Sequence, residues 1–392
     1  MEKTRDAVVI GGGIMGTATA YHLAKRGVGV TLFEKDHLAA GSTGYTCGVI
    51  RQHYSVETLA RMAFRALQVW ENFDETVGGD AGFKKLGVVW VAGSQHKSEF
   101  VSSVKVLQSI GIRAELLDSD SLRELTPYLV AEDVQTGIYE SEGGVADGSM
   151  ACNAFANRAR ELGARIIQGV KVKNIRVVRG KVVGVDTISG SVDTPIVINT
   201  AGPWGPSLAR SIGIKIPAEP SRHQVVSFRQ PDDFQNPMHP VIADFINGFY
   251  TRPDTGNLTN IGALEDDTSD VVRNPDSYNA KADPSFIEDM AERSSRRIPD
   301  LNRGWFKSGW AGMYTVTPDW KPIIDKIELV PGLIVGLGFS GSGFKMGPVV
   351  GEMLADLATG DKLCPIDSSI FRLSRFEDGK EIKGGYDYSI VS

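Results

Sequence analysis

The chain has 392 residues, of which 42% are hydrophobic and 23% charged, as in an ordinary globular protein. Its net charge of −6 gives no electrostatic reason to expect nucleic acid or an anionic membrane as a partner. No apolar run approaches the roughly 20 residues of a membrane-spanning helix, so we expect no transmembrane segment. The three cysteines and six histidines lack metal-ligand spacing, so we expect no metal site. Their scatter and the immediate start of the first strand predict a cytoplasmic protein without a signal or transit peptide.

The first predicted elements are a strand and a glycine-rich turn. Ala7–Ile10 is a short apolar run before glycines, which indicates a buried parallel strand. Gly11, Gly13 and Gly16 follow with G-x-G-x-x-G spacing. The first glycine permits a tight turn, the second lets backbone approach a pyrophosphate, and the third lets a helix pack on the strand. This order predicts the start of a dinucleotide-binding unit.

The next elements complete that unit. A helix over 14–26 directs its N-terminal N–H groups at the phosphates, and a strand over 28–33 follows. Glu34 ends this strand, where a carboxylate binds a ribose diol and repels a 2′-phosphate. We therefore predict a dinucleotide site that disfavours NADP; an empty α/β unit with a glycine-rich turn is the alternative.

The composition of the loop over 41–48 indicates which dinucleotide to expect. It is rich in glycine and small polar residues where an NAD-binding domain would continue with a further strand and helix. Such a loop can lie closely along a large flat ligand, which favours FAD over NAD. Helical periodicity follows over 56–76. Further helices are expected over 99–109, 118–125 with Asp118 or Ser119 as its cap, 150–162 and 284–297, and strands over 87–92, 165–168, 171–178 and 181–189.

The second half of the chain contains two more segments of nucleotide-domain character. A buried strand at 195–202 ends in small residues, and its tip should lie beside the first glycine loop. Short strands and polar turns between 215 and 310 predict a mostly antiparallel sheet. At 333–343 a strand and a glycine turn precede a helix over 348–357, whose positive end would face the cleft.

These motifs, taken together and in order, resemble the D-amino-acid-oxidase (DAO) family of FAD-dependent oxidoreductases. Within it the chain is most similar to the glycine oxidase and sarcosine oxidase branch, including the β subunits of sarcosine oxidase and dye-linked proline dehydrogenase. The resemblance covers about residues 5–375. The motifs that carry it are Gly11–Gly16, Glu34-Lys35, Gly41–Gly44, Asn199–Gly202, Met313–Asp319 and Gly338–Lys345.

The resemblance implies an α/β fold, α+β overall, with two domains. One is an FAD-binding Rossmann-like domain of the glutathione-reductase type; the other is an inserted substrate domain with a mostly antiparallel sheet. The implied ranges are 1–82 with 146–214 and 312–376 for the FAD domain and 83–145 with 215–311 for the substrate domain. The polar composition of residues 377–392 predicts a partly disordered C-terminal tail.

The resemblance also implies which residues bind FAD and substrate. Arg51 and Lys345 match two cations that bind the substrate carboxylate, and Tyr250 resembles a tyrosine near the substrate, although a core position fits it equally well. Gly312 stands where some sarcosine oxidases attach FAD through cysteine, so we expect non-covalent FAD. The implied cofactor-binding residues are Gly11, Gly13, Ile14, Met15, Gly16, Glu34, Lys35, Gly41, Ser42, Thr43, Gly48, Val49, Ile50, Val172, Ala201, Gly202, Gly312, Met313, Gly338, Phe339, Ser340, Gly341, Ser342, Gly343, Phe344 and Lys345.

The activity implied is FAD-dependent oxidation of a small amino acid at its C–N bond, with a secondary or N-methylated amine such as sarcosine, dimethylglycine or proline. Hydride transfer to flavin N5 leaves an imine that water hydrolyses. Our alignment places Asn260 where oxidases of this branch carry an oxygen-activating lysine, which favours a dehydrogenase that reduces a quinone or partner flavoprotein rather than oxygen.

Two other functions remain open at this point. A 2-hydroxy-acid dehydrogenase would need a base, for which His53 or His223 is available, although both are expected to be structural. The chain could also be an FAD-binding subunit or assembly factor of a larger complex. We therefore expect either a homo-oligomer or a subunit of a hetero-oligomeric dehydrogenase.

Overall fold

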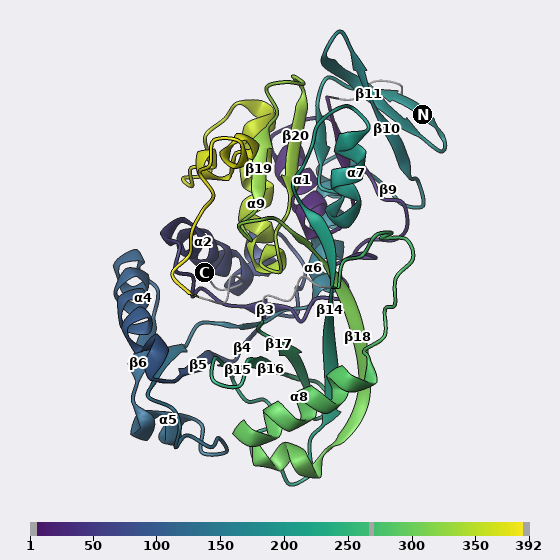
Figure 1. The fold of residues 1–392 in the computed structure, drawn as a ribbon. Coiled ribbons are helices and arrows are strands. Elements are labelled where there is room, and N and C mark those ends of the chain that lie inside the picture. The colour runs from purple at the N-terminus through teal and green to yellow at the C-terminus, as the bar shows by residue number, and fades with distance from the viewer. Residues whose placement is uncertain (1–5, 266–269, 387–392) are drawn as a thin grey trace.

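The computed structural model in Figure 1 describes residues 6–265 and 270–386. A six-stranded sheet, in the order β19-β20-β13-β1-β2-β9, has parallel neighbours except for the antiparallel edge strand β19. In β1, Ala7 and Val9 pack into one hydrophobic cluster, and Val8 and Ile10 into another on the opposite face. The strands are β1 (Ala7–Ile10), β2 (Val30–Phe33), β9 (Arg165–Ile167), β13 (Val197–Asn199), β19 (Ile323–Lys326) and β20 (Leu333–Leu337).

Two different layers cover this sheet. Helices α1, α6 and α9 cover one face, with α1 packed against the other two. A three-stranded antiparallel sheet covers the other face together with α7. This arrangement confirms the Rossmann-like prediction. The covering elements are α1 (Ile14–Lys25), α6 (Gly148–Glu161), α7 (Gly205–Arg210), α9 (Gly343–Thr359), β10 (Val172–Val178), β11 (Lys181–Thr187) and β12 (Gly190–Asp193).

An eight-stranded sheet forms the lower half of Figure 1. Its order is β18-β14-β17-β16-β15-β5-β7-β6, and its neighbours are antiparallel except for β5 and β15. The sheet is therefore mostly antiparallel, as expected. Its strands are β5 (Val88–Ala92), β6 (Ala114–Leu117), β7 (Thr136–Glu140), β14 (Glu219–Arg229), β15 (Val241–Asp244), β16 (Phe249–Asp254), β17 (Leu258–Ala263) and β18 (Trp305–Val316). The helices of this half of the protein are α4 (Lys97–Ile110), α5 (Ser119–Leu125) and α8 (Pro284–Arg297).

Two long strands connect the halves. β14 and β18 pair along their length and rise from the lower sheet toward the six-stranded sheet in Figure 1. The domain boundary predicted between residues 311 and 312 falls inside β18, because this strand continues to Val316. The smaller elements are β3 (Val49–Ile50), β4 (Lys84–Lys85), β8 (Gly144–Val145), η1 (Ser94–His96), η2 (Gly202–Trp204), η3 (Pro299–Arg303), η4 (Ser369–Phe371) and η5 (Leu373–Phe376).

Two predicted helices have different bounds in the structure. The helix expected over 56–76 is divided at Asn72 into α2 (Glu57–Glu71) and α3 (Phe73–Thr76). The last helix begins at Gly343 rather than Pro348, which lies within α9. Proline is favoured in the first turn of a helix, but Pro348 is the sixth residue of α9, where it removes one i→i−4 hydrogen bond without ending the helix. Lys345 consequently lies in the first turn of α9.

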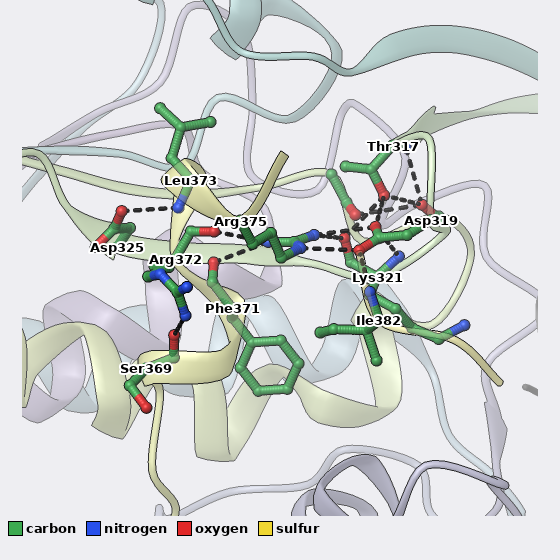
Figure 2. A network of polar contacts seen from close by, with 12 residues as sticks. Thr317, Asp319, Lys321, Asp325, Ser369, Phe371, Arg372, Leu373, Arg375 and Ile382 are labelled. Atoms are coloured by element: carbon green, nitrogen blue, oxygen red, sulfur yellow. Dashed lines mark hydrogen bonds and ion pairs between the residues drawn. The ribbon is translucent and has the colours of Figure 1, made fainter. Parts of the chain in front are cut away.

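The described part of the C-terminal tail is docked on the protein, so the expected disorder is wrong for residues 377–386; residues 387–392 lie outside the described residues. Figure 2 shows Arg375 directed at Asp319, with two hydrogen bonds of 2.8 and 3.0 Å. Asp319 also accepts from the Ile382 N–H at 3.1 Å. The Tyr386 hydroxyl lies 2.7 Å from His53 Nε2. A buried aromatic anchor thus holds a segment whose polar composition suggested freedom.

Within the described residues, no helix is both long and apolar enough to cross a membrane.

Candidate functional site

A cavity of about 1440 Å³ lies between the six-stranded and eight-stranded sheets. It exceeds the roughly 300–1,000 Å³ of a site for a drug-sized molecule. Its walls come from the loops after β1, β2, β13 and β20 and from the cavity-facing parts of β5, β15, β16 and β18. The carboxyl ends of parallel strands therefore converge on it, as they do on nucleotide sites in open α/β sheets.

The glycine loop forms a cradle at one end of this cavity. Gly11 has φ +108°, and a Cβ there would lie 2.6 Å from the Thr200 carbonyl oxygen. The Thr200 N–H donates to the Ile10 carbonyl at 3.0 Å, so the tip of β13 lies beside the loop, as predicted. A Cβ at Gly16 would overlap the Gly11 carbonyl oxygen, which makes Gly16 a packing position behind the cavity. Bare backbone is thus presented where a pyrophosphate would lie.

Glu34 is held rigidly at the wall of the cavity. Its Oε2 accepts from the Gly12 N–H at 2.6 Å and its Oε1 from the Asp36 N–H at 2.9 Å. A carboxylate oxygen has two lone pairs, so each oxygen retains capacity for a further donor such as a ribose hydroxyl.

Lys35 has a different partner from the ribose expected beside it. Its ammonium group forms an ion pair with Asp276 and lies 3.9 Å from the centre of the Trp204 ring. Trp204 Nε1 donates to the same carboxylate at 2.8 Å, and Lys171 Nζ lies 3.5 Å from its other oxygen. Asp276 belongs to residues 270–278, which we call the crossing segment. Lys35 therefore ties this segment over the nucleotide end of the cavity.

Most of the residues predicted to bind the cofactor line this cavity, and three do not. Gly16 packs behind the loop, Ile50 is buried in the core, and Ser342 Oγ donates to the Phe339 carbonyl at 2.7 Å. The predicted residues that line the cavity are Gly11, Gly13, Ile14, Met15, Glu34, Lys35, Gly41, Ser42, Thr43, Gly48, Val49, Val172, Ala201, Gly202, Gly312, Met313, Gly338, Phe339, Ser340, Gly341, Gly343, Phe344 and Lys345.

The loop over 41–48 is tied to the neighbouring strands. Ser42 Oγ donates to the Met313 carbonyl on β18 at 2.6 Å. A Cβ at Gly312 would lie 2.9 Å from Tyr45 Cβ, so glycine permits this close approach. The Tyr250 hydroxyl donates to Cys47 Sγ at 3.2 Å. Burial raises the pKa of Tyr250 and of Cys47, so both groups stay protonated at neutral pH.

Arg51 and Lys345 lie on the wall of the same cavity although they are 294 positions apart in the chain. Both are largely buried. The Arg51 guanidinium donates to the His53 carbonyl and lies 4.2 Å from the centre of the Tyr54 ring. Burial, and after it the Arg51 charge, lowers the pKa of Lys345 well below its ordinary value, whereas Glu140 opposes this change.

Glu140 and Trp90 are functional candidates that the sequence did not indicate. Glu140 ends β7 and is completely buried, and Trp90 lines the cavity from β5. Trp90 Nε1 donates to Glu140 Oε1 at 2.6 Å. A carboxylate at the end of an apolar strand was the available signal, but its partners are distant in sequence.

The two histidines and Asn260 lie in different environments. His53 does not line the cavity, and burial lowers its pKa to about 3. His223 lines the cavity and stacks on Tyr314 with ring centres 3.9 Å apart. Asn260 lies away from the cavity, and its Nδ2 donates to Asp254 at 3.0 Å. Asn260 pairs with Arg252, two residues from Tyr250, so the three side chains lie on the same face of the sheet, although Asn260 is not part of the cavity wall.

The sequence of the chain is similar to those of known proteins. Residues 6–357 match the family model described as FAD dependent oxidoreductase (DAO). The chain is 28% identical over 383 residues to mitochondrial sarcosine dehydrogenase of Mus musculus, covering 91% of this chain and 40% of that protein. It is 29% identical over 385 residues to peroxisomal sarcosine oxidase of Homo sapiens, covering 95% and 96% of the two chains.

A solved structure is similar over nearly the whole length. L-proline dehydrogenase from P. horikoshii superposes with a TM-score of 0.88 at 29% identity, covering 97% of this chain and 100% of that chain. The chain therefore spans about 40% of the length of the sarcosine dehydrogenase that it matches, but nearly all of the other two proteins.

Proposed function

The chain belongs to the DAO family of FAD-dependent oxidoreductases, and from this premise we propose that it oxidises a small amino acid whose amine is secondary or N-methylated. The similar proteins are named for sarcosine and L-proline, which both carry a substituent on the amine nitrogen. The observation that carries the proposal is the pair of buried cations, Arg51 and Lys345, on the wall of a cavity whose other end is the glycine cradle.

The residues present fit FAD. A Cβ at Gly11 would clash with the Thr200 carbonyl oxygen, and one at Gly13 would lie 3.0 Å from Thr43 Oγ1. This cradle opens on the cavity, and the anchored Glu34 carboxylate also lies on the cavity wall. When bound, FAD would accept a hydride equivalent from a carbon atom bonded to the substrate amine nitrogen. Gly343 begins α9 at the cavity, so the positive end of this helix would stabilise the negative charge that the flavin gains.

Arg51 and Lys345 would orient the substrate through its carboxylate. The planar guanidinium of Arg51 can bind both carboxylate oxygens, whereas Lys345 adds a point charge from α9. Trp90, Val241 and Ala243 line the cavity as apolar walls that exclude water and leave room for a small side chain or N-methyl group.

We propose an electron acceptor other than oxygen, either a quinone or a partner flavoprotein. The lysines of the described residues that line the cavity are Lys35, Lys171 and Lys173 at the nucleotide end and Lys345 beside Arg51. None of these lysines lies on β16, which carries Tyr250, or on the neighbouring strands β15 and β17. Such an enzyme would act as a homo-oligomer or as a subunit of a hetero-oligomeric dehydrogenase.

Hydroxy-acid oxidation has no comparable support. His53 lies outside the cavity wall, and its lowered pKa of about 3 makes it a poor base. His223 is stacked against Tyr314, with ring centres 3.9 Å apart.

Anaerobic mixing tests the proposal. The yellow protein is mixed with sarcosine, dimethylglycine, L-proline, glycine, D-alanine or lactate, and the flavin absorbance is followed. We expect bleaching by at least one of the three N-substituted amino acids and slow reoxidation by air. Arg51→Lys should raise KM by about 10- to 100-fold with FAD content unchanged, because a bidentate charged contact is lost. Bleaching by lactate alone would refute amine oxidation.

A further inference from the structure

Glu140 is a fully buried carboxylate beside the two cations of the site. Its Oε2 accepts from the backbone N–H of Gln52 at 2.6 Å and of His53 at 3.1 Å, and its Oε1 accepts from Trp90 Nε1 at 2.6 Å. Three N–H donors thus converge on two oxygens. Burial raises the pKa of Glu140, whereas the three donors and the Arg51 charge act in the opposite direction. The ionised carboxylate accepts all three hydrogen bonds without needing to donate, so the donors favour the charged form.

These contacts connect the chain directly after Arg51 to Trp90 on β5, and both border the proposed substrate-carboxylate site. Gln52 and His53 directly follow Arg51, whose guanidinium donates back to the His53 carbonyl. Trp90 lies on the neighbouring strand β5, with its ring centre 5.3 Å from the Arg51 guanidinium. Glu140 therefore determines both where the chain leaves Arg51 and where the adjacent indole lies.

The charges around Lys345 give Glu140 a second role. Arg51 and Lys345 line the same cavity, and Glu140 is bonded to the two residues directly after Arg51. Arg51 acts on Lys345 as a like charge and Glu140 as the opposite charge. Burial keeps the other titratable groups around Arg51 neutral near pH 7, because it lowers the pKa of His53 to about 3 and raises the pKa of Tyr54 and Tyr314. When Glu140 is ionised and Lys345 is protonated, one net positive charge remains beside Arg51, which matches a substrate with a carboxylate and a neutral amine.

We propose that Glu140 is a positioning residue that fixes the Arg51 loop and supplies the negative charge that keeps Lys345 protonated for carboxylate binding. This inference rests on the proposed function, because it assigns Lys345 to the substrate carboxylate.

The experiment measures binding of acetate, a carboxylate that cannot be oxidised as an amine, through its perturbation of the flavin spectrum between pH 6 and pH 10. In the wild type, affinity should fall at alkaline pH as Lys345 loses its proton. In Glu140→Gln this fall should move down by about one pH unit, the low end of the effect of a nearby opposite charge. Above both midpoints, acetate affinity should then be about tenfold weaker than in the wild type at the same pH.

Two controls separate charge from packing. Lys345→Gln should abolish the alkaline fall, which assigns it to this ammonium group. Trp90→Phe removes the indole donor but leaves the Glu140 charge, so its midpoint should match the wild type even if affinity changes uniformly. Because a glutamine amide would face the Trp90 N–H, the double variant Trp90→Phe, Glu140→Gln replaces Glu140→Gln if that protein does not fold or retain FAD.

An unchanged alkaline midpoint in the Glu140 variant, with acetate still bound by the wild type, would overturn the role of Glu140 and leave the proposed function intact. Failure of the wild type to bind acetate, together with no bleaching by any amino acid, would overturn both. The same conclusion about Glu140 would follow if Lys345→Gln kept the alkaline fall.

Discussion

Individual side chains at the flavin end of the cavity bear on how the cofactor is held. Gly312 offers no nucleophile, and its close approach to Tyr45 leaves no space for one. Cys47 lines the cavity, but the Tyr250 hydroxyl donates to its sulfur and burial raises the pKa of the thiol. A neutral thiol is a poor nucleophile, because the thiolate is the reactive form.

We therefore expect FAD to be bound without a covalent bond. Precipitation of the protein with acid should leave a colourless pellet and release all of the flavin into the supernatant, where its absorbance can be measured. A yellow pellet would contradict this expectation. If the pellet of Cys47→Ala were then colourless, the attachment would be assigned to Cys47.

The role of a residue could be predicted from the sequence where its partners lie close to it in the chain, and not where they are distant. The glycine cradle and Glu34 could be predicted because their chemistry lies in one strand-turn-helix-strand unit. Glu140 could not, since its contacts with Gln52 and His53 are 88 and 87 positions away. The Lys35 contact with Asp276 joins residues 241 positions apart. In the sequence, a carboxylate that will be buried cannot be told from one that will be exposed, because its hydrogen-bond donors come from distant parts of the chain.

Among the elements, the crossing segment 270–278 is the one that the sequence did not suggest. It carries no regular secondary structure beyond one isolated bridge between Val271 and Ser221, yet Asp276 connects it to Lys35, Lys171 and Trp204 at the cavity. By contrast, α4 and α8 lie close to their predicted ranges because their apolar periodicity is strong. Asp118 caps α5 by accepting from the Ser121 N–H at 2.8 Å, as one of the two predicted caps.

Removing the Asp276 carboxylate should loosen the nucleotide end of the cavity. We expect Asp276→Ala to weaken FAD binding by about two- to fivefold, because partly exposed ion pairs contribute roughly 0.2–1 kcal/mol. Titration of the apoprotein with FAD, followed by flavin fluorescence, measures the effect. Asp193→Ala is the matched control, since it removes the exposed ion pair that Asp193 on β12 forms with Arg176 on β10, away from the cavity. Equal affinities of the two variants would contradict a role for the crossing segment.

At the scale of the whole molecule, buried histidines couple stability to pH. His53 and His239 are completely inaccessible to solvent, and burial lowers their pKa to about 3 and about 4. The unfolded chain takes up protons on these rings near pH 6.5, whereas the folded chain does so only at much lower pH. The unfolded state therefore binds more protons in this interval, and stability is lost as the pH falls from 6.5 toward 4.

His239→Asn tests this coupling away from the cavity. His239 Nδ1 lies 2.6 Å from the Pro240 carbonyl, and an asparagine amide can donate there without titrating. The loss in free energy of unfolding between pH 7 and pH 5 should be about 2 kcal/mol smaller in the variant than in the wild type. Urea denaturation of the FAD-saturated proteins at the two pH values gives this difference. A loss of the same size in both proteins would show that His239 does not contribute.

The order of strands in the six-stranded sheet has a consequence for biosynthesis. β13 receives its second neighbour only when β20, residues Leu333–Leu337, has left the ribosome, and α9 follows later still. Until then β13 presents an unpaired edge that neighbouring chains can join. Because Gly338–Lys345 complete the cavity wall only after β20, the cofactor site is assembled at the end of synthesis, and a chain that stops before β20 would lack it.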